Sequence, residues 1–257
     1  MLVLLAAWLT CGRHVSVGAV CLTEDQRTRL AALVRSDPEA GRLFDKVRRD
    51  ADACLDDPAR PIATIRTAGR LNAEPEKAIV GLIGFLVNDP SLVSQAVGEF
   101  KKQIASNLRP DGSSLDFHDR DALHYHCYDI EPLLTLAIAA RQNGVDLYSY
   151  VASNGASFSN SVRFLVPYCN GTARHAEWVN SKVKFDRIRA EAGEQKFKVG
   201  SAFEPRTALR VFELASFFEH GYKPLVAQLA GKSGSRYPTW QSLLNEVCRH
   251  SLRSAGL

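Results

Sequence analysis

The sequence predicts a mostly helical protein made of antiparallel helices joined by short loops. Apolar residues recur at spacings of three and four, as in the stripe Leu123, Cys127, Ile130, Leu134 and Ala137, which places them on one face of a helix. A strong turn signal at 110–114 separates such segments, and no run of central strands is present. We therefore expect paired helices with under about a tenth of residues in strands, against roughly 20–25% in an average globular domain.

Helix starts are marked by capping residues in the first half of the chain. Thr23 precedes Gln26 by three residues, which is a capping box, and Asp37-Pro38 and Asp89-Pro90 each pair a capping carboxylate with a proline in the first turn. The apolar segment 78–87 predicts a buried helix that ends at Asn88. Residues 62–67 alternate like a short extended segment.

The helix that carries the apolar stripe has two possible starts. Residues 120–131 could be continuous helix, ending later at Gly144 as its C′ residue. Alternatively Asp129 could cap a helix that starts afresh, because Pro132 lacks an N–H and disfavours helix at the residue before it. Beyond a loop at 148–158 and a short apolar segment at 161–166, the pattern predicts further helices at 175–192, 206–218, 222–229 and 240–252.

The net charge of the chain is close to neutral, which bears on the partners it could bind. The 257 residues include 32 basic and 28 acidic ones, a net charge of +4, and no block of lysine or arginine stands out. This balance gives no indication of nucleic-acid binding, but it is compatible with a groove for an acidic ligand.

The first residues resemble an export signal. Residues 2–9 are apolar and Val17-Gly18-Ala19 supplies small residues at a cleavage spacing. We expect residues 1–19 to be a signal peptide and 20–257 the mature domain, periplasmic or secreted, although a buried first helix is the alternative. The apolar run is too short to span a bilayer, so no stable membrane anchor is expected.

Six cysteines occur, and none forms a Cys-x-x-Cys pair, which argues against a zinc site. No other metal and no cofactor is indicated by the pattern. Cys127 lies on the apolar stripe, so we expect it to be a buried free thiol.

The densest group of chemically capable side chains is the segment 120–128, Arg-Asp-Ala-Leu-His-Tyr-His-Cys-Tyr. If it is helical, Arg120, His124, Tyr128 and Glu131 share one narrow face opposite the apolar stripe.

Tyrosine has an unperturbed pKa near ~10, so it needs a nearby cation to act as a base. Arg120 and His124 are the available cations, and such a group suits β-elimination from a uronic acid sugar. A glycosidase would need two opposed carboxylates, and no pair is singled out. The alternative is that the histidines and tyrosines of this segment are half-buried residues that only stabilise the fold.

These motifs resemble the alginate lyase family. The similarity runs from Asp111-Gly112-Ser113 through 120–128 to the segment 143–148, with a weaker likeness at 63–69. The resemblance implies an all-α fold, an incomplete α/α toroid of antiparallel helical hairpins with a sugar-binding cleft. It also implies proton transfer by the tyrosine at 128 and substrate contact by an arginine of this motif.

The chain departs from the family pattern in two places. Asp121 stands where the common pattern has arginine, with Arg120 one position earlier. No Asn-Asn-x-His segment precedes the helix at 78–83, and the spacing from Gly69 to Asp111 is shorter than the family's. The resemblance therefore predicts a shortened toroid that lacks one catalytic element of the family.

Other polar and aromatic residues could contact a sugar chain. We expect substrate-binding positions at Tyr125, His126, His175, Trp178 and Lys182, although 175–182 could equally be a capped, solvated helix start. The predicted function is a lyase that cleaves uronate polymers such as alginate, with an acidic polysaccharide as its partner. The alternatives are an impaired remnant that binds acidic glycans and a helical scaffold.

Overall fold

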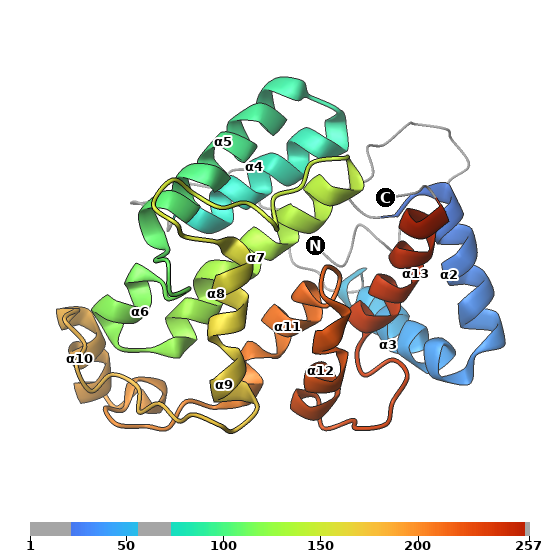
Figure 1. The fold of residues 1–257 in the computed structure, drawn as a ribbon. Helices are drawn as coiled ribbons and strands as arrows, with labels where there is room; N and C mark the ends of the chain where they lie inside the picture. Colours follow the sequence, from blue (N-terminus) through green and yellow to red (C-terminus); the bar gives the residue numbers. More distant parts are fainter. Residues whose placement is uncertain (1–21, 56–72, 255–257) are drawn as a thin grey trace.

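The computed structural model describes residues 22–55 and 73–254 of the chain (Figure 1). Within these ranges no strand is present, and only isolated β-bridges occur, such as Leu108 with Ser114. The predicted all-α class is confirmed. The expected signal peptide at 1–19 and the expected extended segment at 62–67 lie outside the described residues.

The helices are α2 (Glu24–Ser36), α3 (Pro38–Leu55), α4 (Ala73–Val87), α5 (Pro90–Asn107), α6 (Leu115–Arg120), α7 (Leu123–Gln142), α8 (Phe158–Phe164), α9 (Val166–Cys169), α10 (Lys184–Glu191), α11 (Leu209–Ala215), α12 (Lys223–Leu229) and α13 (Trp240–Ser254). Short 3₁₀ turns lie at η1 (Gln195–Phe197), η2 (Pro205–Ala208) and η3 (His220–Tyr222). None of the helices in the described ranges has the length and apolarity needed to cross a membrane.

Local capping explains where the first helices begin. Thr23 and Gln26 form the predicted capping box at the start of α2. Asp37 accepts hydrogen bonds from the first backbone N–H groups of α3, and Asp89 does the same for α5. These side chains satisfy donors that a helix start leaves without an intrahelical partner, so the predicted boundaries are confirmed.

Helix α7 runs through the main core and positions the polar segment of the sequence. Its predicted stripe, from Leu123 to Ala137, is buried, and it packs against α4, α6 and α11. Gly81 lets α4 approach closely, because a Cβ there would stand only 2.4 Å from Leu136 Cδ1 of α7. Gly144 follows the helix with a φ of +81°, as expected for a C′ residue. The buried face of α7 therefore fixes the direction of its opposite face.

A second, smaller core joins the beginning and the end of the chain. Leu30 of α2 and Ala40 of α3 are buried together with Tyr237, Leu243 and Val247 from the last part of the sequence. Figure 1 shows α2, α3 and α13 as a group beside the larger helical body. The described part of the chain thus buries its apolar residues in two main clusters.

Two predicted helices are shorter than expected. The predicted helix at 175–192 contains only α10, because the backbone of 175–183 bonds to other segments: the N–H of Trp178 donates to the Asp121 carbonyl and that of Glu177 to Ser201. The predicted helix at 206–218 is helix α11 preceded by the 3₁₀ turn η2. The helices predicted at 222–229 and 240–252 are confirmed as α12 and α13.

Candidate functional site

The polar segment 120–128 contains a sharp corner between two helices. Helix α6 ends at Arg120, Asp121 adopts the left-handed conformation with φ 50° and ψ 47°, and α7 begins at Leu123. Neither start predicted from the sequence is correct. The segment 120–131 is not one continuous helix, and Asp129 is buried inside α7 instead of capping it, with Pro132 accommodated in the helix interior.

Distant residues hold this corner. The carbonyl of Asp121 accepts from the backbone N–H of Trp178 at 2.8 Å and from His175 Nε2 at 3.0 Å, and its carboxylate accepts from the backbone N–H of Asn180 at 2.7 Å. These bonds stabilise a left-handed residue, a conformation that aspartate tolerates better than most residues. Asp121, which stands where the family pattern has arginine, therefore has a structural role at the corner.

The start of α7 is capped from the same distant segment. Its own N-cap residue, Ala122, offers no side-chain acceptor. Instead Glu177, which is buried, accepts the backbone N–H of His124 at 3.1 Å. Burial raises the pKa of the Glu177 carboxyl, while the hydrogen bond from His124 acts in the opposite direction. A carboxylate is favoured at a helix N-terminus, and here it fixes the backbone that carries His124.

Tyr128 is the exposed member of a largely buried helix segment. Tyr128 is 45% exposed, whereas its neighbours Cys127 and Asp129 are both buried. His124 lies one turn before Tyr128 and Glu131 about one turn after it, and both are partly exposed. These three side chains share the face of α7 opposite the apolar stripe. We refer to His124, Tyr128 and Glu131 as the α7 face.

His124 is neutral at physiological pH. Burial is the main reason that its pKa falls from 6.5 to about 4, and the positive charge of Lys196 lowers it further. The prediction that His124 supplies a cation for Tyr128 is therefore wrong. A neutral imidazole can instead accept or pass on a proton, or orient a ligand by a hydrogen bond.

Arg120 lies at the end of α6 and points to α10 instead of the α7 face. Its guanidinium contacts Asp186 at 2.5 Å, and the side chain of Asp186 is only 1% exposed. It also stacks over the ring of Tyr125 at 3.9 Å. The expectation that Arg120 shares one face with His124 and Tyr128 is corrected, because the break at Asp121 turns it away.

The five residues expected to contact substrate have different environments. His126 is fully buried and donates to the Ser161 carbonyl at 2.9 Å, and Trp178 is buried against Tyr125 and Phe197. The structure thus gives His126 and Trp178 packing roles in place of the expected substrate contact. Tyr125 is half-buried at the corner, where its ring also contacts Tyr128. His175 lies near the Asp121 carboxylate at 3.5 Å, and the exposed Lys182 pairs with Asp119 at 3.2 Å.

Lys196 belongs to the site although no motif marked it. It is an exposed residue of η1, and its neighbour Phe197 is buried against Trp178 with ring centroids 5.0 Å apart. Trp178 in turn contacts Tyr125 at 5.6 Å. This chain of ring contacts attaches η1 to the corner, and the positive charge of Lys196 lowers the pKa of His124. Only the tertiary contacts reveal it.

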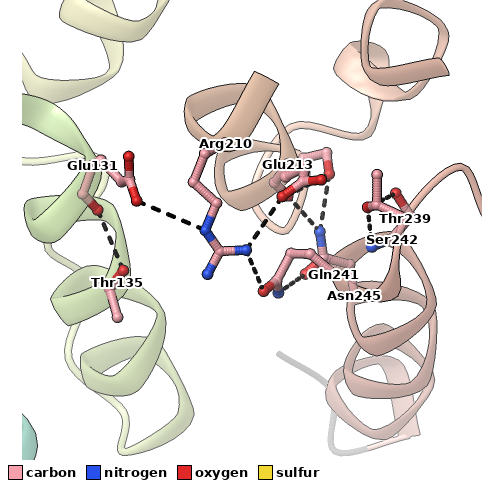
Figure 2. A network of polar contacts seen from close by, with 9 residues as sticks. Glu131, Thr135, Arg210, Glu213, Thr239, Gln241, Ser242 and Asn245 are labelled. Carbon is pink, nitrogen blue, oxygen red and sulfur yellow. Dashed lines mark hydrogen bonds and ion pairs between the residues drawn. The ribbon is translucent and has the colours of Figure 1, made fainter. Parts of the chain in front are cut away.

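A polar network continues from the other end of the α7 face (Figure 2). Glu131 Oε1 lies 3.9 Å from Nε of Arg210 on α11, and Arg210 Nη1 donates to Glu213 at 3.2 Å and to Gln241 at 3.3 Å. Asn245 of α13 donates to the Glu213 carbonyl at 2.8 Å. Burial raises the pKa of Glu131, and Arg210 opposes that effect. We refer to these residues as the Arg210 network; sequence reasoning missed it.

The arrangement is suited to proton transfer at an open surface. A reachable phenol lies between a neutral imidazole and a carboxylate on one helix face, with Lys196 near one end and Arg210 near the other. Among the described residues no group of three or more His, Cys, Asp or Glu side chains could hold a metal ion. Cys127, Cys169 and Cys248 are buried free thiols, as expected for Cys127.

Two of three comparisons with known proteins gave a match. Residues 76–178 match the family model of alginate lyase, a range that contains most of α4, all of α5 to α9 and the corner. This confirms the expected resemblance to that family over the matched range. Among solved structures, the chain is similar to an alginate lyase from Bacteroides ovatus, with 16% identity and a TM-score of 0.47 over 84% of this chain and 53% of that one. The chain thus spans about half the length of that protein. Comparison with curated proteins finds no match.

Proposed function

We propose that this protein is a polysaccharide lyase that cleaves uronate polymers such as alginate by β-elimination, with Tyr128 as its proton-transfer residue. The observation that carries the proposal is the exposed phenol of Tyr128 on a helix whose other face is buried, within the range that matches the alginate lyase family. A half-exposed tyrosine with a neutral histidine one turn away is a suitable group for moving a proton at a bound ligand.

The proposed reaction uses the α7 face as follows. A base removes the proton on the sugar carbon next to the carboxylate, a carbon–carbon double bond forms, and the bond to the glycosidic oxygen breaks. The leaving oxygen takes a proton from an acid. Tyr128 serves as one of these two groups, and neutral His124 serves as its partner. Lys196, whose positive charge lowers the pKa of His124, also favours the negative charge that develops near the substrate carboxylate.

The direct test follows the unsaturated product. Purified protein is incubated with alginate and with other uronate polymers, and the ultraviolet absorbance of the new double bond is recorded. Tyr128→Phe should lower the rate roughly 10²–10⁴-fold, the usual range for general acid–base catalysis, and His124→Ala should also lower it. Tyr150→Phe, a partly exposed tyrosine outside α7, is the matched control and should retain the rate. An unchanged rate in Tyr128→Phe would refute the role of Tyr128.

A second candidate is a protein that binds acidic glycans without cleaving them. One specific feature favours it: Asp121 holds the corner where the family pattern has arginine, and Arg120 is bound to Asp186. Retention on immobilised alginate without any unsaturated product would support binding alone. Product formation would exclude it.

We also propose that the protein is exported to the periplasm or secreted after removal of residues 1–19. The support is the apolar run at 2–9 followed by small residues at 17–19. Intact-mass measurement of protein recovered from its native host tests this, and a retained Met1 would contradict it.

A further inference from the structure

We propose that Arg210 binds the carboxylate of a uronate unit next to Tyr128, and that the Glu131 carboxylate faces this guanidinium when no glycan is bound. The inference rests on the proposed function, because it names a binding residue for the same class of substrate. It adds a second point of attachment to the site, on α11 instead of α7. No sequence motif contains this arginine.

The first step of the argument is position. Glu131 lies three residues after Tyr128 on α7, and side chains at this spacing are neighbours on a helix surface, with Cβ atoms about 5–6 Å apart. Glu131 Oε1 is 3.9 Å from Arg210 Nε. A sugar chain bound over the phenol of Tyr128 and continuing past Glu131 would therefore reach the guanidinium of Arg210.

The second step is how Arg210 is held. Its Nη1 donates to the carboxylate of Glu213, whose side chain is largely buried, and to Gln241 Oε1. Gln241 is itself bonded to Asn245 at 2.8 Å. Two helices thus fix one side of the guanidinium in advance, which lowers the cost of ordering it when a ligand binds.

The third step is what remains available. Arginine carries five N–H donors in a planar fork that matches a carboxylate in two-point contact. The side chain of Arg210 is 39% exposed, and Figure 2 shows its other terminal nitrogen without a marked contact. Nε faces Glu131 at a distance longer than a hydrogen bond. The edge formed by Nε and this nitrogen is therefore paired only with Glu131, at a distance that leaves room for another carboxylate to replace it.

The fourth step concerns Glu131. Its side chain is 46% exposed, and its pairing with Arg210 spans 3.9 Å. Ion pairs of this exposure and length are weak, so a carboxylate from a ligand can displace it. Glu131 is then a competitor for Arg210, and its removal should strengthen binding of an acidic glycan.

The experiment measures binding in the absence of turnover. In a Tyr128→Phe background, the affinity for a uronate oligosaccharide and for a neutral glucan of equal length is measured by calorimetry. Arg210→Gln should weaken uronate binding about tenfold to a hundredfold, the range for a charge-assisted hydrogen bond, and leave the glucan unaffected. Arg210→Lys should lose less affinity, and Glu131→Gln should gain affinity. Circular dichroism checks that each variant is folded.

Arg163→Gln is the matched control. Arg163 is an exposed arginine on α8 that pairs with Glu219 at 3.1 Å, so the change also removes one ion pair between elements. Equal uronate affinity in Arg210→Gln and Arg163→Gln would overturn the assignment of Arg210, while product formation by the unsubstituted protein would leave the proposed function intact. Failure of the unsubstituted protein to bind or cleave any uronate would overturn both.

Discussion

Two arginine-centred regions lie at the two ends of the α7 face, and they differ in the burial of their carboxylate partners. Arg120 at the corner is 21% exposed and pairs with Asp186, whose side chain is 1% exposed. Arg210 is 39% exposed and faces Glu131, which is 46% exposed. A buried carboxylate needs its counter-ion at all times, whereas an exposed one can release it. The comparison indicates that Arg120 stabilises the fold and that Arg210 is available to a ligand.

The largest expected effect is on stability at Arg120. Arg120→Met leaves Asp186 buried without its cation, and removal of one partner from a buried pair costs about 3–5 kcal/mol. We expect a loss near the lower end, because Arg120 is partly exposed and Asp186 also accepts from Ser181. Urea unfolding would measure it. Asp116→Asn, which removes the longer and more exposed contact of Arg120 at 3.8 Å, should change the unfolding free energy little. Equal losses in the two variants would contradict the structural role.

Cys127→Ala should give an intermediate loss. The thiol is buried on the inner face of α7 between the two regions, so its removal should cost about 1–3 kcal/mol of stability. Elimination activity should be unchanged, because the thiol does not reach the α7 face. The same urea series and the product assay would test this, and a loss of rate without a loss of stability would contradict it.

His124 should make stability depend on pH in a defined direction. Its folded pKa is about 4 and its ordinary value 6.5, so between these values the unfolded chain binds a proton that the folded chain does not. His124 therefore does not change the unfolding free energy with pH above about 6.5. As the pH falls from there towards 4, protonation of the unfolded chain lowers the unfolding free energy, with a slope of at most about 1.4 kcal/mol per pH unit.

The corresponding experiment compares the unsubstituted protein with His124→Gln between pH 4 and 7. The variant should lose less stability on acidification. Glu177 and Glu131 have raised pKa values and act in the opposite direction in both proteins, so the difference between the two curves isolates His124. Parallel curves would show that His124 does not titrate in this way.

The smallest expected effect is the stability of Arg210→Gln. Exposed ion pairs contribute about 0–1 kcal/mol, so the unfolding free energy should fall by no more than that, although uronate binding weakens. A loss of unfolding free energy as large as that of Arg120→Met would contradict the conclusion that Arg210 contributes little to stability. Thermal and urea unfolding of Arg210→Gln and Arg120→Met under one set of conditions would measure the two losses.

The parts of the fold that were predictable depend on residues close in sequence. Thr23 finds Gln26 three residues away, and the buried stripe of α7 follows from spacing alone. Segment 175–183 was assigned wrongly because its hydrogen-bond partners, such as Asp121 and Ser201, are distant in the chain. Local propensity contains no information about such partners.

In the candidate site, too, only features that depend on residues close in sequence were predictable. Tyr128 was predicted to lie opposite the stripe, and its exposure agrees with that position. Arg120 was placed on the wrong surface because one left-handed residue, Asp121, separates it from α7. Lys196 and Arg210 carry no local signal, since Arg210 contacts Glu131, and Lys196 acts on the pKa of His124, from elements far away in sequence.

The second core has a consequence for the order in which the chain folds. Glu39 near the start of α3 accepts from Ser235 and from the backbone of Tyr237, contacts that span 196 and 198 residues. Contacts of such separation form late, because the intervening chain must first be brought together. During synthesis the hairpin of α2 and α3 emerges before α13, so its apolar side remains uncovered until α13 is complete. Helices α2 and α3 therefore reach their native environment only after most of the described chain has been synthesised.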